Sequence, residues 1–329
     1  MISNRAIEDG ELSNTRGALT FWITDSDDVR TLQNWKSISA DEFRTQLVAA
    51  AEAFPSLPAS EQENQKHVTI FVHGYNETWA DAAAVYQSIV SNLFRGDASL
   101  GLCILFTWPS AGAPLDYLPD REQARASAPD LAAVLDQFYD WLLAKQVAAA
   151  RNPDRACRAK TSIIAHSMGN YVLQEAMNLS WNRKNQPLLV SLVSQLLMVA
   201  ADVDNDLFDD DAAPGKSAGD GIANLTYRVT ALYTGRDPIL GLSAGLKHFG
   251  KRRLGRSGLD RSPGKSLPDN VWDVDCSSLI PPDATNIHSS YFQTSSPKTL
   301  ELMRQVLRGV DRTVLATMGL VPARAAAHS

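Results

Sequence analysis

The sequence lacks the features that mark secreted, membrane-spanning and nucleic-acid-binding proteins. Only three of its 329 residues are cysteines, and this odd number speaks against a disulfide framework. The N-terminal residues contain no apolar segment of the signal-peptide kind. The longest apolar run, residues 188–201, is interrupted by polar residues and is too short to span a bilayer. A net charge of −6 argues against nucleic acid as the main partner. We therefore expect a cytoplasmic protein without a transmembrane segment.

The three cysteines also lack the spacing of a metal site. Cys157 lies close to Arg155 and Arg158, whose charges favour a lowered thiol pKa. No histidine lies near it in the sequence, so a structural thiol in a reducing compartment is the plainer interpretation.

What the chain does contain is an alternation of apolar, β-branched runs with helical patterns. This alternation predicts an α/β fold with a mostly parallel sheet covered by helices on both faces. The length fits one large domain or two small ones, and we predict a single domain over residues 1–329. Its core is expected at about 18–310, with a flexible insertion at about 241–269 before the last strand. The expected strands are residues 19–24, 68–72, 102–107, 161–165, 195–201, 227–233 and 271–276.

Start signals mark the helices between these strands. Ser39 and Glu42 form a capping-box pattern, and Thr78 can cap a second helix that reaches Phe94. Ser127 with Pro129 predicts the start of a third helix. The apolar stripes on these helices indicate core packing rather than a cofactor site.

The most informative segment is residues 163–170, Ile-Ile-Ala-His-Ser-Met-Gly-Asn. A short apolar strand leads into Ser167, which is flanked by the small residues Ala165 and Gly169, and an amphipathic helix follows. This is the pattern of a nucleophile elbow, in which a serine occupies a strained strand-to-helix turn. Alanine replaces the usual glycine two residues before the serine, and the pattern tolerates it.

A serine hydroxyl needs a histidine base and an acid that orients it, in the chain order Ser, acid, His. Three histidines follow Ser167. His328 lies at the end of the chain, where chains fray, and His248 lies in the basic insertion. His288 lies in a polar loop after the last expected strand, so we predict that it is the base.

Two aspartates are candidates for the acid. Asp237 follows the strand expected at 227–233, and Asp202 follows the strand before it. Both loops lie at the same edge of a parallel sheet. We favour Asp237, with Asp202 as the alternative or as a residue that holds a loop and contacts substrate. The run from Asp202 to Asp206 resembles a calcium loop, but Leu207 and Ala213 replace the glycine and glutamate that such a loop requires.

The oxyanion of an acyl-transfer intermediate needs two backbone donors. Met168 N–H, just after the serine, supplies one, and Tyr75 N–H, in the His-Gly-Tyr loop after the strand at 68–72, supplies the other. Gly74 lets this loop approach the reacting carbonyl, and His73 is expected to hold the loop. Trp108 and Tyr117 are expected to form apolar walls of the substrate pocket.

The stretch 241–269 is basic and rich in glycine, serine and proline. Its plainer interpretation is a solvated or mobile excursion. The alternative is a flap that recognises an acidic group of the substrate.

These motifs together resemble one family. Residues 71–76, Thr107 to Ser110, 165–170, 201–204 and Tyr233 with Asp237 are similar to the bacterial α/β-hydrolase family filed as domain of unknown function 900, over about residues 18–292. That family is similar to lipases and carboxylesterases in fold and elbow. The resemblance implies a serine esterase that uses Ser167, His288 and an aspartate.

The sequence therefore predicts a serine carboxylesterase that acts on a small-molecule ester and needs no metal or organic cofactor. Lipid or thioester hydrolysis and acyl transfer remain alternatives, because all of them proceed through the same acyl-enzyme. A non-catalytic binding module on the same fold is the alternative of another class.

Overall fold

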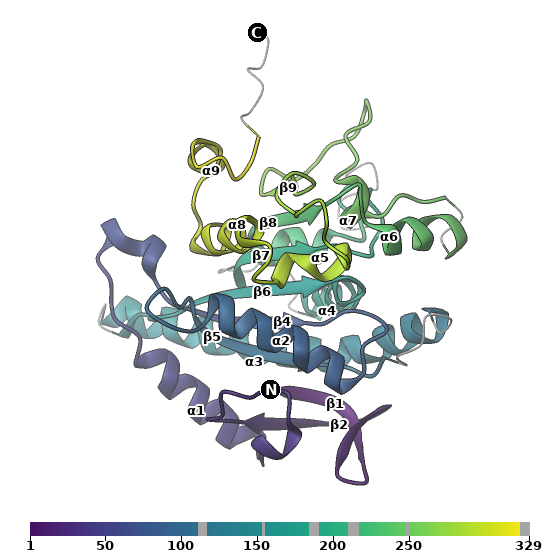
Figure 1. Ribbon diagram of the computed structural model, residues 1–329. Helices are drawn as coiled ribbons and strands as arrows, with labels where there is room; N and C mark the ends of the chain where they lie inside the picture. The colour runs from purple at the N-terminus through teal and green to yellow at the C-terminus, as the bar shows by residue number, and fades with distance from the viewer. Residues whose placement is uncertain (111–116, 153–154, 184–190, 210–216, 248–249, 323–329) are drawn as a thin grey trace.

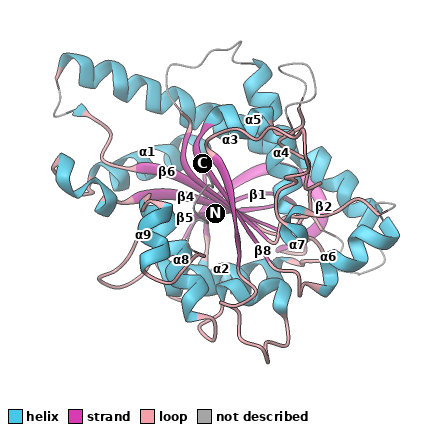
Figure 2. Cartoon of the chain, turned by 90° about the horizontal axis from the view of Figure 1, so that it is seen from above, coloured by secondary structure: helices cyan, strands magenta, loops and turns pink. Residues whose placement is uncertain are grey.

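The computed structural model describes residues 1–110, 117–152, 155–183, 191–209, 217–247 and 250–322. Its centre is a mixed sheet of nine strands in the order β3-β2-β1-β5-β4-β6-β7-β8-β9. Helices cover both faces of this sheet (Figures 1 and 2). The predicted α/β fold with a mostly parallel sheet is confirmed.

Six of the predicted strands form the parallel part of the sheet, and their ends agree with the predictions to within two residues. They are β4 (His67–Val72), β5 (Gly101–Thr107), β6 (Lys160–His166), β7 (Val193–Val199), β8 (Thr226–Tyr233) and β9 (Val271–Asp275). All residues of β4 are buried. Ile70 and Val72 belong to one core cluster and Phe71 to the other, because side chains alternate between the faces of a strand.

The N-terminal part of the sheet is antiparallel and begins earlier than the core expected from about residue 18. It contains β1 (Ile2–Glu8), β2 (Glu11–Ile23) and β3 (Lys36–Ile38). β1 pairs antiparallel with β2 and parallel with β5. The sequence did not predict β1, because Ser3, Asn4 and Arg5 are polar and yet wholly buried. These side chains are hydrogen-bonded to distant parts of the chain, which no local pattern reveals.

Two layers of helices enclose the sheet. One core cluster joins it to α1 (Ala40–Glu52), α3 (Tyr117–Arg151), α4 (Gly169–Arg183) and α5 (Asp220–Leu225), and the other joins it to α2 (Trp79–Leu93) and α8 (Pro297–Arg308). Figure 2 shows these layers on opposite sides of the strands. The shorter helices are η1 (Leu32–Asn34), η2 (Ala59–Asn64), α6 (Pro238–Leu242), η4 (Ser243–Lys247), α7 (Leu254–Ser257), η5 (Ile287–Phe292) and α9 (Arg312–Thr317). No helix among the described residues is both long and apolar enough to cross a membrane.

Two of the three predicted helix starts are confirmed. The Ser39 side chain accepts a hydrogen bond from Glu42 N–H, and Thr78 forms a reciprocal capping box with Asp81. The third is wrong, because Ser127 and Pro129 lie inside α3, which begins at Tyr117. Burial of Tyr117, Ala124 and Ala128 against the core extends the helix through the proline.

The basic stretch 241–269 is packed against the chain over much of its described length. Arg253 is wholly buried, and its guanidinium binds the carboxylates of Asp202 and Asp204. Lys251 also pairs with Asp204. The interpretation as a solvated excursion is therefore wrong for this part, because its cations meet acidic residues of the loop after β7.

Candidate active site

Ser167 occupies the strained turn that the sequence predicted. It lies between the end of β6 and the start of α4, and its φ angle is +52°, in the left-handed region that non-glycine residues rarely adopt. A Cβ atom added to Gly169 would lie 2.3 Å from the His73 carbonyl oxygen. Only glycine therefore allows the start of α4 to approach the loop after β4 this closely.

His288 and Asp237 come together at the same edge of the sheet, although 51 residues separate them. His288 lies in η5, and its Nδ1 is 2.6 Å from Asp237 Oδ2. The other carboxylate oxygen accepts hydrogen bonds from Ile239 N–H and Leu240 N–H at the start of α6. This arrangement holds the carboxylate in one orientation and directs Oδ2 at the imidazole.

Several interactions determine the charge of the Asp237 carboxyl. Burial by itself would raise its pKa, but the hydrogen bond and charge of His288 and the two backbone amides outweigh burial and lower the pKa. The carboxylate is therefore ionised at neutral pH. An ionised carboxylate at Nδ1 favours the imidazole form that leaves Nε2 available as a base.

His166, which precedes Ser167 in the chain, contacts His288. The His166 ring is 4.9 Å from the His288 ring, centroid to centroid, and its Nε2 lies 3.0 Å from the His288 carbonyl oxygen. Among the described residues, the Ser167 hydroxyl forms no hydrogen bond with the His288 imidazole. His248 and His328, the other candidates for the base, lie outside the described residues.

Asp202 lies in a different environment. Its carboxylate accepts hydrogen bonds from Tyr117 OH at 2.8 Å, Ser243 Oγ at 2.9 Å and Arg253 Nε at 2.8 Å. Its backbone N–H donates to the Ser167 carbonyl oxygen at 3.1 Å. Asp202 thus holds the loop after β7 against the serine turn, while Asp237 contacts the histidine.

The loop after β4 packs directly against the serine. A Cβ atom added to Gly74 would lie 3.0 Å from Ser167 Cβ and 3.1 Å from His166 Nδ1. Met168 N–H has no hydrogen-bond acceptor among the described residues, as an oxyanion donor requires. The absence of a side chain at Gly74 therefore lets this loop approach Ser167 closely.

Trp108 and Tyr117, which the sequence predicted as walls of the substrate pocket, are both buried in the core. Trp108 is wholly buried and stacks on the His73 ring, with 5.4 Å between centroids and 7° between planes. Tyr117 packs edge-on against Tyr75, with 5.5 Å between centroids. Both side chains support the loops around the serine, and neither lines the cavity described next.

A cavity of about 390 Å³ is lined by His288 and by Tyr75 of the loop after β4, and Ser167 is not among its lining residues. Its lining is partly polar, and among its described residues it contains no lysine or arginine. The polar members include Glu77, Asp81, Asn286 and Gln293, and the apolar ones include Tyr75 and Phe292. The sequence motifs did not point to Glu77. A carboxylate four residues after His73, in the loop that follows a buried strand, was the available signal.

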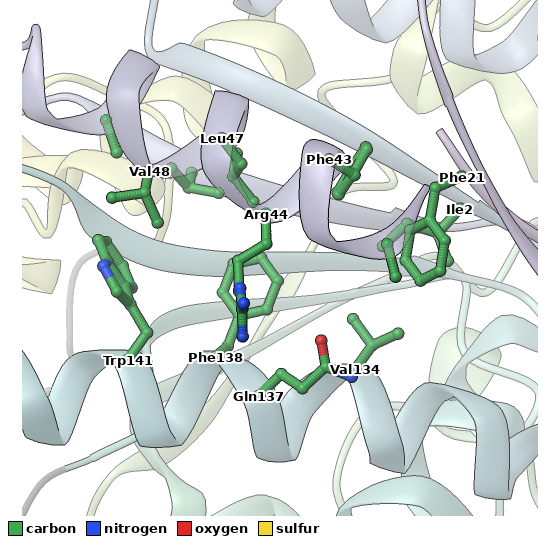
Figure 3. Close-up of a pocket in the computed structure, with 13 residues that line it drawn as sticks. Ile2, Phe21, Phe43, Arg44, Leu47, Val48, Val134, Gln137, Phe138 and Trp141 are labelled. Carbon is green, nitrogen blue, oxygen red and sulfur yellow. The ribbon is translucent and has the colours of Figure 1, made fainter. Parts of the chain in front are cut away.

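A second, apolar cavity of about 50 Å³ lies between α1 and α3. Figure 3 shows Phe43, Leu47 and Val48 on α1 facing Phe138 and Trp141 on α3. None of its lining residues comes from the serine, aspartate or histidine loops. This cavity is a gap in the packing of two helices rather than part of the site.

Two other kinds of site, a reactive thiol and a metal centre, can be checked in the described residues. Burial raises the pKa of Cys157, which favours the structural thiol over the lowered pKa that the neighbouring arginines suggested. No group of three or more His, Cys, Asp and Glu side chains in the described part of the chain is arranged to hold a metal ion.

The mixed sheet, its two helix layers and the strand–turn–helix at Ser167 define an α/β-hydrolase fold. Residues 52–305 match the family described as alpha/beta hydrolase of unknown function (DUF900). The protein belongs to this family. The resemblance inferred from the sequence motifs is thereby confirmed.

Other relatives are distant. The uncharacterized protein alr1448 of Nostoc sp. (strain PCC 7120) is 27% identical over 148 residues, which are 38% of this chain and 35% of that protein. The chain thus spans about a third of the length of this curated relative.

Among solved structures, an esterase of Pyrobaculum calidifontis is 11% identical, with a TM-score of 0.38 over 74% of this chain and 76% of the esterase. Ester-hydrolase EH1AB1 from the metagenome of Lake Arreo is also 11% identical, with a TM-score of 0.37 over 83% of this chain and 90% of that enzyme. Likeness at this level indicates nothing about substrate.

Proposed function

We propose that the protein is a serine hydrolase that cleaves carboxylic esters of small molecules through an acyl-enzyme on Ser167. The observation that carries the proposal is the 2.6 Å contact between His288 Nδ1 and Asp237 Oδ2, beside a serine at a φ of +52°. A strained serine, a buried histidine and an ionised aspartate are the three groups that nucleophilic catalysis by serine needs.

In the proposed mechanism, Ser167 Oγ attacks the ester carbonyl while His288 Nε2 accepts the hydroxyl proton. Asp237 stabilises the imidazolium that forms. The imidazolium then protonates the departing alcohol, which leaves an acyl group on Ser167. Water, activated by the same imidazole, attacks the acyl-enzyme and releases the acid. The hydrogen bond between Ser167 Oγ and His288 Nε2 forms when substrate is bound, since catalytic hydrogen bonds tighten in that complex.

The N–H groups of Tyr75 and Met168 are proposed to bind the oxyanion of the tetrahedral intermediate. Met168 precedes α4, where backbone N–H groups and the helix dipole favour negative charge. Met168 is also the residue after the nucleophile, which is the usual source of one oxyanion donor in this fold.

The cavity beside His288 supports a short, polar ester rather than a long-chain lipid as the substrate. Carboxylates and amides contribute to its lining together with aromatic side chains. Burying a long acyl chain against these polar groups would cost free energy. Esters of short acids should therefore react faster than their long-chain homologues.

The test compares the wild type with Ser167→Ala on p-nitrophenyl acetate and p-nitrophenyl octanoate. We expect wild-type hydrolysis with a preference for acetate, and a loss on the order of 10³-fold or more in Ser167→Ala. A fluorophosphonate probe should label the wild type at Ser167 only. The matched control is Ser289→Ala, which removes a hydroxyl that lines the same cavity and should retain activity.

The opposite results would refute the proposal. Retained hydrolysis in Ser167→Ala would mean that another residue reacts. A folded wild type that neither hydrolyses any ester of a varied panel nor reacts with the probe would favour the binding-module alternative.

A further inference from the structure

Glu77 carries a carboxylate that the proposed mechanism does not use. It lies in the loop after β4 and is only 8% exposed. Burial disfavours an ionised carboxylate, so such a group needs compensating contacts. Two histidine rings face it at ion-pair distance, since Oε2 lies 3.2 Å from His73 Nδ1 and Oε1 lies 3.7 Å from His166 Nδ1. Neither contact has hydrogen-bond geometry, so both act electrostatically.

The charge state of Glu77 follows from these contacts. Burial alone would raise its pKa, but the facing imidazole rings of His166 and His73 outweigh burial and lower it well below the usual range. The carboxylate is therefore negative at neutral pH. Arg5 also holds the backbone of this residue, because its Nη2 donates to the Glu77 carbonyl oxygen at 2.8 Å.

The hydrogen bonds of His73 determine which of its ring nitrogens carries hydrogen. Trp108 N–H donates to His73 Nε2 at 3.1 Å, so Nε2 is an acceptor. Burial lowers the pKa of His73, so the ring is neutral and its hydrogen is on Nδ1. From Nδ1 the ring reaches both the Gly74 carbonyl oxygen, at 2.9 Å, and the Glu77 carboxylate.

This hydrogen bond bears on the oxyanion donor. The Gly74 carbonyl and the Tyr75 N–H belong to one planar trans peptide unit and point in opposite directions. When His73 Nδ1–H holds the carbonyl, it also determines the direction of the Tyr75 N–H. The carboxylate of Glu77 favours the ring form that makes this bond.

The contact between Glu77 and His166 connects Glu77 to the segment of His288. A carbonyl oxygen can only accept, so His166 Nε2 donates to the His288 carbonyl across 3.0 Å. The opposite nitrogen of the ring faces Glu77. A single carboxylate thus contacts the ring that holds the oxyanion loop and the ring that holds the backbone of His288.

We propose that Glu77 is a positioning residue that, through His73 and His166, aims the Tyr75 N–H and the His288 segment at the carbonyl attacked by Ser167. This inference rests on the proposed esterase function. It goes beyond that function by assigning Glu77 a role in the transition state without contact to the substrate.

The test measures kcat and KM for p-nitrophenyl acetate in Glu77→Ala and Glu77→Gln. Oxyanion donors act on charge that exists only in the transition state, so misaligning one lowers kcat and leaves KM nearly unchanged. We expect Glu77→Ala to lose kcat by about 100-fold, near the lower range for loss of one oxyanion donor. Glu77→Gln keeps an acceptor for His73 Nδ1–H and should recover about tenfold of that loss.

The matched control is Asp41→Asn. Asp41 carries the same charge, is exposed in the first turn of α1, pairs with Arg44 and lines neither cavity. Its kcat should stay within about twofold of the wild type. Urea unfolding of each variant separates this effect from lost folding, and Glu77→Gln serves if Glu77→Ala does not fold.

Each contrary result has a distinct meaning. If Ser167→Ala is inactive but both Glu77 variants keep the wild-type kcat, the positioning role is wrong and the proposed function stands. A rise in KM with unchanged kcat would also refute the positioning role. If the wild type has no esterase activity, both proposals fail.

Discussion

At the scale of single residues, the two aspartates after β7 and β8 show how environment separates similar side chains. Asp237 offers one oxygen to two backbone amides and the other to His288. Asp202 is bound to a buried arginine and two hydroxyl groups. One carboxylate is thus placed to orient a base, and the other neutralises a buried cation.

This difference predicts opposite effects of the same substitution. Asp237→Asn should lower kcat by about 10³- to 10⁴-fold, because the amide favours the wrong imidazole tautomer, with a small change in stability. Asp202→Asn should lower the free energy of unfolding by about 3–5 kcal/mol, because it leaves Arg253 buried without its partner, and should retain more of the activity. Ester hydrolysis and urea unfolding of both variants check this.

Asp204→Asn is the control for the second effect. Its side chain is 34% exposed, so its loss should cost less stability than the loss of Asp202. If Asp202→Asn abolishes turnover and Asp237→Asn does not, Asp202 is the acid of the triad.

At the scale of elements, local patterns predicted the strands well and the helix ends unevenly. The runs that became β4 to β7 are mainly apolar and buried, as central parallel strands are. The start of α3 was misplaced because Pro129 is a strong start signal, whereas packing of the preceding turns against the core extends the helix. The sequence did not predict β1, because its buried polar side chains find their hydrogen-bond partners only in the folded protein.

Pro129, inside α3, lowers the stability of the protein. Pro129 lacks the N–H that an interior helix position uses, and its ring crowds the preceding turn. Because Pro129 is exposed, Pro129→Ala should raise the free energy of unfolding by about 1–3 kcal/mol. Urea unfolding at neutral pH measures this change.

Pro297 provides the comparison, because it occupies the first turn of α8, where the N–H has no helical acceptor. Pro297→Ala should bring no gain in stability. Equal gains at both positions would show that the interior position is not the cause.

At the scale of the whole molecule, burial of histidines couples stability to pH. Burial, with the charge of Lys160, lowers the pKa of His67 to about 3. Its ordinary pKa in an unfolded chain is near 6.5. Between these values the unfolded chain binds a proton that the folded protein does not. The stability that depends on the neutral ring is therefore complete above pH 6.5 and is lost as the pH falls toward 3.

The free energy of unfolding should accordingly fall between pH 6.5 and 4.5, by up to about 1.4 kcal/mol per pH unit for each such histidine. His73, whose pKa burial also lowers, adds to this slope. Below about pH 4, protonation of Asp237 and Glu77, whose folded pKa values are lowered, should destabilise the protein further. Urea unfolding in a series of buffers measures the slope.

His67→Asn should reduce that slope by about one proton. Ser162→Ala is its control, because it removes the hydroxyl 3.2 Å from His67 Nδ1 and leaves the ring in place. That variant should lower stability without changing the slope. An unchanged slope in His67→Asn would contradict the assignment to His67.

The sequence by itself determined what depends on neighbours along the chain. The strand–turn–helix around Ser167, the caps of α1 and α2 and the buried strands β4 to β9 all follow from residues within a few positions of one another. Only the tertiary structure decided which aspartate contacts His288, that Arg253 pairs with Asp202, and that Glu77 lies between two histidines. The physical reason is that these pairs join side chains far apart in sequence, whose charges meet only when the sheet has assembled.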